Sequence, residues 1–496
     1  MSVEGSTRAE RRRLAVAILL TAAIVLPLGW MWWSSRLPST YSVMDMGYDD
    51  YGGGARTAAH QHGTTARSVA DLTADPAREP DVRVDLVARK ERFDLVSGRR
   101  VDGYTINGQS PGPQISAAEG QLVEVHLMNE SVPDGITLHW HGVDVPNAED
   151  GVAGVTQDAV RVGHEYVYRF VAERPGTYWY HSHQVSHAQV QGGLLGALVI
   201  RPRGAPAAGV LDFTAVSHLY GSQATVNGND KNVQVQAAPG QQVRVRLVNT
   251  DNGTLPAWLT GGTYKVLAVD GYDVHQPQPV NGKALFIPAG GRADLAIEAP
   301  KDGSAVRLDL GGGPALLIGQ SATAPTARPQ PSGHLDLLGY GTPSPLGFSP
   351  EAADRTFRYS IGRRPGFVNG RPGIWWSING HLFPDVPMFV VAEGDVVRMH
   401  ISNHSGRLHP MHLHGHHAVV LARNGVKASG SPWWVDSLDV ASGASYDIAF
   451  VADNPGIWMD HCHNLPHAQQ GLVAHLMYEG VSEPYRVGGA ADNDPE

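Results

Sequence analysis

Three stretches of the chain repeat one pattern of alternating hydrophobic and polar residues. In each, an Asn-Gly pair is followed by a later glycine, an alternating segment, and an asparagine nine residues after that glycine. The glycines are Gly120, Gly240 and Gly394, and the asparagines are Asn129, Asn249 and Asn403. Alternation with period two is typical of strands that bury one face, and Asn-Gly and Pro-Gly pairs mark turns. The pattern therefore predicts an all-β chain of three related units.

Each unit is predicted to be a Greek-key β-sandwich, because short strands separated by regular turns form two packed sheets. We place the three domains at residues 81–205, 206–345 and 346–480, with a C-terminal tail at residues 481–496. The 58 glycines and 34 prolines favour short strands joined by turns over long helices.

One long apolar segment precedes these units. The run from Leu14 to Trp33 carries no charge and follows Arg8, Arg11, Arg12 and Arg13. As a helix it would span about 30 Å, which is the hydrocarbon thickness of a bilayer. Because the arginines should stay cytoplasmic, residues 1–33 are predicted to anchor the protein in the cell membrane as a single pass, with the three domains outside. A cleaved signal peptide is the competing interpretation, although no A-x-A-like cleavage site follows the run.

Residues 34–80 separate this predicted anchor from the first domain. They include the stretch MGYDDYGGGARTAAHQHGTTARS, which is polar, rich in glycine and without periodicity. Such a composition predicts a flexible linker.

The net charge argues against nucleic-acid binding, and the histidine and cysteine content favours metal binding. The formal net charge of −10 argues against nucleic acid as a partner. The chain has 24 histidines, many of them clustered, and neutral imidazole is the commonest metal ligand in proteins. Its single cysteine, Cys462, forms no internal disulfide, so an exported chain must bury this thiol or bind a metal with it.

Histidine pairs occur after the first and third repeats but not after the second. They are His139 and His141, His181 and His183, His412 and His414, and His461 and His463. At the places of His409, His412 and His414 the second unit carries Leu255, Trp258 and Thr260. Histidines scattered over a surface would not follow a repeat, so these pairs indicate a shared metal cluster between the first and third domains.

Cys462 lies between two of these histidines. Because neighbouring residues of a strand point to opposite faces, His461 and His463 point away from the thiol and toward the cluster. A thiolate with two imidazoles, here His409 and His467, is the ligand set of a blue-copper electron-transfer site. An electron on such a copper would have a short covalent path through Cys462 to the cluster. The alternative is that Cys462 is a buried cysteine that packs as a small hydrophobic residue.

The four motifs HWHG, HSH, HPMHLHGHH and HCHNLPHAQQGL occur in the order found in the multicopper oxidases, which the chain resembles from Tyr104 to about Tyr478. The resemblance implies three cupredoxin-like (plastocyanin-like) domains and four copper ions. It places type 1 copper at His409, Cys462 and His467, and type 2 copper at His139 and His412. The type 3 pair would take His141, His181 and His463 on one ion, and His183, His414 and His461 on the other.

Some positions depart from the family pattern or extend it. The axial position of type 1 copper, often methionine, is Leu472, so we expect a higher reduction potential than in relatives with methionine. A glutamate that several bacterial members carry is Ala468 here, and Asp460 is a candidate replacement. Asp150 matches an acid that the family carries near type 2 copper, and the resemblance implies that it supplies protons to the oxygen that is being reduced. Its alternative role is to form a turn with Gly151.

The remaining histidines are expected to have plainer roles. One of His416 and His417 is expected to pack behind the cluster. His187 and His475 are expected at the surface or in ordinary hydrogen bonds.

The resemblance implies a laccase-like, copper-dependent oxidoreductase that couples oxidation of a small reducing substrate to reduction of dioxygen to water. Phenol-type donors are favoured, because the ten methionines form no methionine-rich cluster and no carboxylate group can be placed near His467. Oxidation of Cu(I), Fe(II) or Mn(II) in copper tolerance is the alternative, and a copper-binding protein without turnover is a third hypothesis. The segment from Asn424 to Trp434 is expected to help form the substrate pocket, and the catalytic region is expected to be monomeric.

Overall fold

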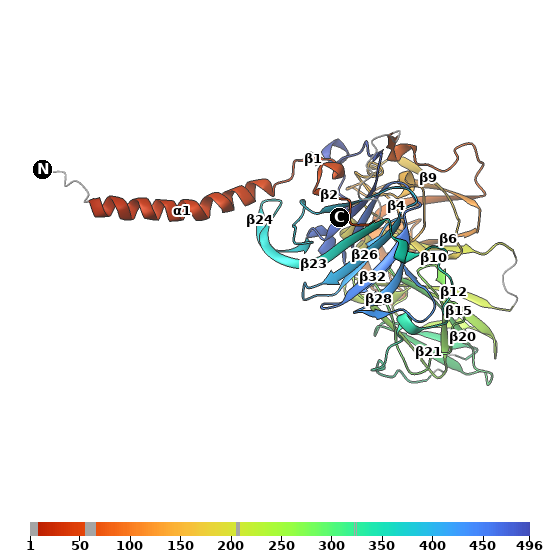
Figure 1. Ribbon diagram of the computed structural model, residues 1–496. Helices are drawn as coiled ribbons and strands as arrows, with labels where there is room; N and C mark the ends of the chain where they lie inside the picture. The colour runs from red at the N-terminus through yellow and green to blue at the C-terminus, as the bar shows by residue number, and fades with distance from the viewer. Residues whose placement is uncertain (1–7, 55–65, 205–208, 322, 324) are drawn as a thin grey trace.

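The computed structural model describes residues 8–54, 66–204, 209–321, 323 and 325–496. Strands predominate and build three successive sandwiches, each made of two sheets (Figure 1). The predicted all-β class is therefore confirmed, with one long helix, α1 (Arg8–Ser34), ahead of the sandwiches.

The three sandwiches follow one another along the chain. The first contains β4 (Val82–Asp94), β5 (Arg100–Ile106), β6 (Gly112–Ala118), β7 (Leu122–Asn129), β8 (His139–His141), β9 (Glu165–Val171), β10 (Gly176–His181), α2 (Ser186–Gly192) and β11 (Leu195–Arg201). The second contains β12 (Leu211–Tyr220), β13 (Gln223–Val226), β14 (Val233–Gln236), β15 (Gln242–Asn249), β16 (Leu255–Thr260), β17 (Tyr264–Val269), β18 (Tyr272–Asp273), β19 (Leu285–Ile287), β20 (Arg292–Glu298), β21 (Ala305–Leu310) and β22 (Leu316–Gly319). The third contains β23 (Arg355–Val368), β24 (Arg371–Ile378), β25 (Pro387–Val391), β26 (Val396–Asn403), β27 (His409–Leu413), β28 (Ala418–Arg423), β29 (Val426–Lys427), β30 (Trp433–Val435), β31 (Ser437–Val440), β32 (Ser445–Val451), β33 (Ile457–Cys462), α3 (Leu465–Gln469) and β34 (Val473–Tyr478).

The three sequence repeats form equivalent strands, β7, β15 and β26. Each lies between one parallel and one antiparallel neighbour: β4 and β9, β12 and β20, and β23 and β32. The asparagine that ends each repeat is buried, and its side-chain amide donates to backbone carbonyls of nearby loops. In the third sandwich Asn403 donates to Arg407 and Val440, both at 2.7 Å, and so fixes the loop that leads into His409.

The first and third sandwiches share one continuous hydrophobic core, whereas most of the second has a core of its own. Asn147 of the first sandwich bonds to Ile457 of the third across their interface. Its side-chain amide donates to the carbonyl of Ile457 at 3.0 Å, and its Oδ1 accepts from the Ile457 N–H at 3.0 Å. The interface between the first and third sandwiches is therefore tightly packed, and it is there that the histidine-bearing strands β8, β10, β27 and β33 come together.

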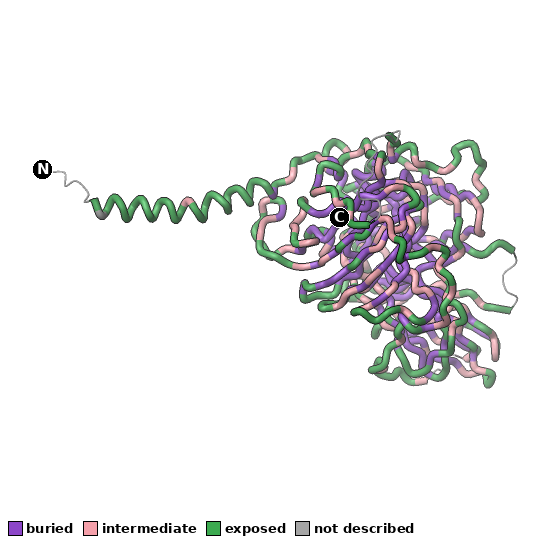
Figure 2. The backbone as a smooth tube through the Cα atoms, in the orientation of Figure 1, coloured by how far each residue is buried: buried purple, intermediate pink, exposed green. Residues whose placement is uncertain are grey.

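Helix α1 projects away from the sandwiches, and nearly all of its described residues are exposed (Figure 2). Its segment Glu10–Ser34 has a mean hydropathy of 2.3 over the most apolar window and is long enough to cross a membrane. A signal sequence would have the same properties, so the helix is a candidate for either role.

The prediction of a flexible linker at residues 34–80 is wrong for most of the segment. β1 (Thr40–Tyr41) pairs with β36 (Val487–Gly488), β2 (Tyr48–Asp50) extends a sheet of the third sandwich beside β25, and β3 (Arg67–Ser68) pairs with β35 (Val481–Ser482). Val43, Met46 and Val69 are buried beneath these strands. Strands of two or three residues are too short for a periodic pattern, and residues 55–65 lie outside the described part of the chain.

Candidate metal centre

Eight buried histidines meet between the first and third sandwiches, and we call them the histidine cluster. They are His139, His141, His181, His183, His412, His414, His461 and His463, each at most 1% exposed. Strand pairing aligns them: His181 lies opposite His139 in β10 and β8, and His412 lies opposite His461 in β27 and β33. His139 and His141 share one face of β8 because residues two apart on a strand do so, whereas His183, His414 and His463 lie just beyond the ends of β10, β27 and β33.

Ring nitrogens from different sandwiches lie close together in the histidine cluster. The Nε2 atoms of His139 and His412 are 3.4 Å apart, and those of His414 and His461 are 3.2 Å apart. Three sets have their nitrogens within 4.8 Å of one another: His139, His141 and His181; His139, His412 and His414; and His183, His414 and His461. These separations suit several adjacent metal ions better than one.

The protonation of the cluster suits a metal centre. Burial lowers the pKa of His183 to about 3 and lowers those of His141, His181 and His463 well below the usual value, so these rings are neutral. Within the described chain, Nε2 of His181 and both ring nitrogens of His183 and His463 have no hydrogen-bond partner. Buried polar nitrogens without partners are costly, and a metal ion that accepts their lone pairs removes that cost.

A second site lies on the other face of β33 and comprises His409, Cys462 and His467; we call it the thiol site. The Cys462 Sγ is 3.5 Å from the His409 Nδ1 and 3.7 Å from the His467 Nδ1. Burial raises the pKa of Cys462 well above its usual value, so a bound cation is needed to hold the thiolate. The ring of Trp376 covers both imidazoles, with centroid distances of 4.7 Å to His409 and 4.5 Å to His467.

Two buried aspartates link the sandwiches through the histidine cluster. Asp150, from the first sandwich, accepts from Nδ1 of His414 in the third at 3.0 Å. In the reverse direction Asp436, between β30 and β31 of the third sandwich, lies 3.2 Å from the His141 Nε2 of the first. Carboxylates behind metal-binding imidazoles fix their tautomer and orientation. Asp150 therefore contacts the His414 ring from behind, and Asp436, which was not predicted from the sequence, contacts His141 in the same way.

The middle sandwich, which carries none of these histidines, also reaches the cluster. Arg292 at the start of β20 is buried and donates to both carboxylate oxygens of Asp436, at 2.6 and 2.5 Å, while its Nη1 lies 3.4 Å from Asp270. Burial alone would raise the pKa of Asp436, but Arg292 holds it well below the usual value. Gly290 has φ +80°, and a Cβ there would lie 2.6 Å from Cε1 of His141, so no larger residue fits.

Asp460, the candidate replacement for the missing glutamate, does not face the histidine cluster. Asp460 lies on the strand face opposite His461, where its carboxylate faces the Tyr359 hydroxyl at 3.5 Å. The carboxylate near His461 instead belongs to Glu496, whose Oε1 is 3.2 Å from the His461 Nδ1. The tail at residues 481–496 thus packs against the cluster, a contact that no local sequence pattern indicated.

The remaining histidines differ in their surroundings. His417 lies between Asp144, at 3.2 Å, and Asp436, at 3.1 Å, and these acids raise its pKa to about 9 although burial alone would lower it. His416 pairs with the Tyr478 hydroxyl at 2.7 Å. The expectation for His475 is wrong: it is 2% exposed, and neither ring nitrogen has a hydrogen-bond partner within the described residues. His187 is partly exposed.

Replacing Asp150 by asparagine tests its positioning role. The neutral amide oxygen accepts a weaker hydrogen bond from the His414 Nδ1 than a carboxylate does, so we expect copper affinity and oxygen consumption to fall by about 10–100-fold. Glu149→Gln is the matched control, because Glu149 is an adjacent buried acid whose carboxylate accepts from the Arg169 N–H instead. Equal losses in both variants, measured by copper titration and an oxygen electrode, would show that burial rather than the histidine contact matters.

The chain is similar in sequence and in structure to known proteins. A family model described as "Multicopper oxidase" matches residues 88–205, and a second of the same description matches residues 355–480. The chain is 27% identical to "Laccase-1" of Botryotinia fuckeliana, over 78% of this chain and 80% of that protein, and 27% identical to "Multicopper oxidase MmcO" of Mycobacterium tuberculosis, over 85% and 92%. A solved multicopper oxidase structure from Pseudomonas thermotolerans matches with a TM-score of 0.66 at 27% identity, over 80% of this chain and 98% of that one. The two matched segments contain the whole histidine cluster and the whole thiol site.

Proposed function

Because this chain belongs to the multicopper oxidases, which are copper-dependent oxidoreductases with cupredoxin-like domains, we propose that it oxidises phenol-type donors and reduces dioxygen to water. Oxidase activity of this family implies a reducing substrate and dioxygen as reactants. The observation that carries the proposal is that β33 joins the two sites, with Cys462 of the thiol site on one face and His461, one of the eight buried imidazoles of the cluster, on the other.

We assign four copper ions to these residues. Type 1 copper would be held by the thiol site, and type 2 copper by His139 and His412. One type 3 ion would be held by His183, His414 and His461, and the other by His141, His181 and His463. Bound copper would supply the one-electron chemistry, and Cys462, bonded through the chain to His461 and His463, would join the two sites. Asp150 is proposed to supply protons to the dioxygen that is being reduced and also to position His414.

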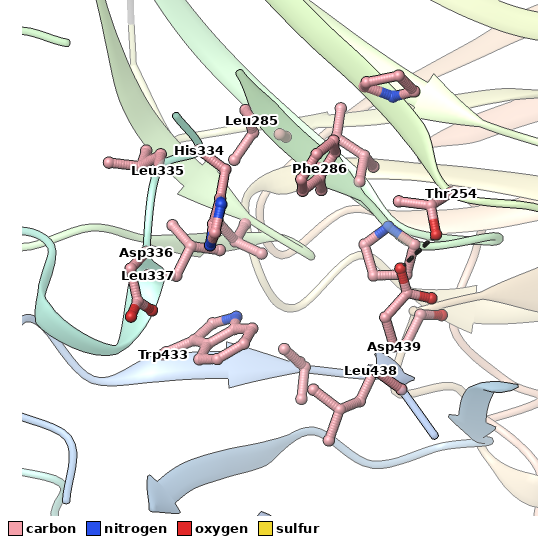
Figure 3. A pocket seen from close by; sticks show the side chains of 18 of the residues that line it. Thr254, Leu285, Phe286, His334, Leu335, Asp336, Leu337, Trp433, Leu438 and Asp439 are labelled. Carbon is pink, nitrogen blue, oxygen red and sulfur yellow. Dashed lines mark hydrogen bonds between the residues drawn. The ribbon is translucent and has the colours of Figure 1, made fainter. Parts of the chain in front are cut away.

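A cavity of about 430 Å³ between the middle and third sandwiches is our candidate donor site (Figure 3). Leu408, which precedes the type 1 ligand His409, lines it together with Phe286 and Trp433, the latter from the segment expected to form a substrate pocket. Asp439 lies in its wall, close enough to the thiol site to raise the pKa of Cys462 further. Apolar walls with a few polar groups are typical of sites for small aromatic molecules.

Charge around the thiol site favours a phenol over a metal ion. Burial, and then the guanidinium groups of Arg407 and Arg363, lower the pKa of His467 to about 4. A positive field of this kind repels Cu(I), Fe(II) and Mn(II) and does not oppose a neutral phenol. The metal-ion alternative is second, because a cation would meet Arg363 and Arg407 near His467, although Asp336 and Asp439 in the cavity wall would attract it.

Oxygen uptake by the copper-loaded protein separates these functions. We expect a methoxyphenol to support faster uptake than Cu(I) or Fe(II). Faster uptake with a metal ion would replace the proposal by a metal oxidase. No uptake with any donor, in protein that contains its full copper, would contradict oxidase activity altogether.

The axial position of the thiol site gives a separate prediction. The carbonyl of Leu472 accepts from the Cys462 N–H at 3.1 Å, and its side chain is fully buried. We expect Leu472→Met to lower the reduction potential of type 1 copper, because a thioether donates electron density to the cupric ion and leucine does not. Redox titration of the blue absorption measures this, with Leu476→Met as a buried control. An unchanged potential in Leu472→Met would contradict the axial assignment.

We also propose that α1 anchors the protein in the cell membrane, with the N-terminus in the cytoplasm and the sandwiches outside. The proposal is supported by the arginines before the apolar run and by the exposure of the helix. Retention of residues 1–34 in protein isolated from membranes, measured by mass spectrometry, tests it against signal cleavage.

A further inference from the structure

A hairpin of the third sandwich is fastened to the end of helix α1. β23 and β24 are joined by the turn at Asn369 and Gly370, which lies beside the last turn of the helix (Figure 1). The Oδ1 of Asn369 accepts from the Leu37 N–H at 3.4 Å, and the Gly370 N–H donates to the Ser35 hydroxyl at 3.1 Å. A Cβ at Gly370 would lie 3.3 Å from Nε1 of Trp32, so the turn touches the helix itself.

This hairpin is basic although the chain as a whole is acidic. Residues 361–384 contain Arg363, Arg364 and Arg371 and no aspartate or glutamate, whereas the net charge of the chain is −10. All three arginines are exposed, and Arg36 adds a fourth cation over the Trp32 ring. The outer strand β24 also presents an apolar side chain to solvent, since Ile374 is 63% exposed.

The tryptophans of α1 set the depth of the hairpin relative to a bilayer. Trp30, Trp32 and Trp33 lie at the end of the helix nearest the sandwiches and are 65%, 42% and 63% exposed. Indole rings at the end of a transmembrane helix lie at the level of the lipid headgroups. Because the turn at Gly370 lies close to Trp32 and bonds to Ser35, a bilayer crossed by α1 would bring the hairpin turn to the same level.

We propose that hairpin β23–β24 docks on the surface of an anionic phospholipid bilayer, with Arg364 and Arg371 at lipid phosphates and Ile374 among the headgroups. The inference rests on the proposal that α1 is a membrane anchor and goes beyond the proposed oxidase activity. A bilayer is the partner that fits, because the hairpin continues directly from the apolar helix and combines cations with an exposed apolar side chain.

Docking would also orient the thiol site. Trp376, on the same strand β24, covers the rings of His409 and His467, and the Arg363 guanidinium lies 4.8 Å from the Trp376 ring centroid. A bilayer that holds β24 would therefore fix the strand that covers the thiol site and turn this side of the third sandwich toward the membrane.

A single fluorescent label tests the docking. Cys462 is buried, so Ile374→Cys gives the full-length protein one accessible thiol for an environment-sensitive dye. In full-length protein reconstituted into vesicles, we expect the emission to shift to shorter wavelength when phosphatidylglycerol is added to phosphatidylcholine. Val96→Cys is the matched control, because Val96 is 62% exposed in a hairpin whose Ser97 bonds to Asp230 of the middle sandwich. Its emission should be the same in both kinds of vesicle.

Charge reversal tests the lipid contact. In the labelled Ile374→Cys protein, Arg364→Glu with Arg371→Glu should abolish the shift, whereas Arg161→Glu with Arg328→Glu, at exposed positions of other domains, should leave it intact. A label that reports water in both vesicle types would overturn the proposal, as would an equal shift with and without phosphatidylglycerol. So would protein that fails to float with vesicles through α1. Oxygen uptake on the same samples reports the proposed oxidase activity separately.

Discussion

Cys462→Ser is expected to remove the blue colour and the oxidation of donors while leaving the protein folded. A hydroxyl would be a poor ligand for a copper ion held with His409 and His467, and the thiol is bonded through the chain to the histidines on either side of it. Because loss of an outer partner of a metal ligand already costs about 10–100-fold, loss of this first ligand should reduce oxygen uptake by more than that. The measurements are visible absorption, copper content and uptake with a methoxyphenol.

The loss of colour and of donor oxidation in Cys462→Ser would report on the thiol site alone, because the substitution removes no residue of the histidine cluster. We expect the copper content to fall by one ion while the cluster keeps its metal. His400→Ser removes an exposed histidine that pairs with Asp447 and serves as the control for general loss of imidazole. Survival of the blue colour or of donor oxidation in Cys462→Ser would show that electrons take a different route.

Arg292→Met should have the largest effect on stability. Arg292 is 1% exposed and lies between Asp436 and Asp270, so its loss leaves two buried carboxylates without their cation. Removing one partner of a buried ion pair costs about 3–5 kcal/mol in the free energy of unfolding. We also expect copper to bind about 10–100-fold more weakly, because Asp436 would no longer be fixed behind His141.

Arg355→Met separates the two effects of that variant. Arg355 is equally buried and bonds to Asp395 and Glu479 in the third sandwich, away from the histidines. Denaturant unfolding should show a comparable loss of stability, whereas chelator competition should show unchanged copper affinity. Equal weakening of copper binding in both variants would mean that Arg292 acts through stability alone.

The fold could be read from the sequence where its signal is repeated. The alternating segments became β7, β15 and β26 with equivalent neighbours, because apolar side chains at every second position pack into the core while the polar ones between them face the other side of the sheet. β1, β2 and β3 have only two or three residues, and their pairing depends on partners more than 300 residues away. No local pattern encodes such contacts, which is why the segment was predicted to be a linker.

In the candidate site, too, some residues could be predicted from the sequence and others could not. The histidines of the cluster were found because their spacing follows the repeat and strand geometry carries them to one face. Asp436 and Arg292 were not found, because each acts on a ring or an acid from another sandwich, 295 and 144 residues away in the sequence. A charged residue inside the apolar stretch WWVDSL, at residues 433–438, was the one available signal for Asp436.

The placement of the histidine cluster between two sandwiches also sets an order for biogenesis. Half of its rings come from residues 139–183 and half from residues 412–463, so neither part of a growing chain offers a complete site. Copper can be captured only after the last sandwich has been synthesised and has folded onto the first. In a protein tethered by α1 whose export begins before synthesis ends, the first sandwich would cross the membrane before its partner exists. Metal acquisition would then belong to the compartment in which folding ends, and copper delivery must serve the finished protein there.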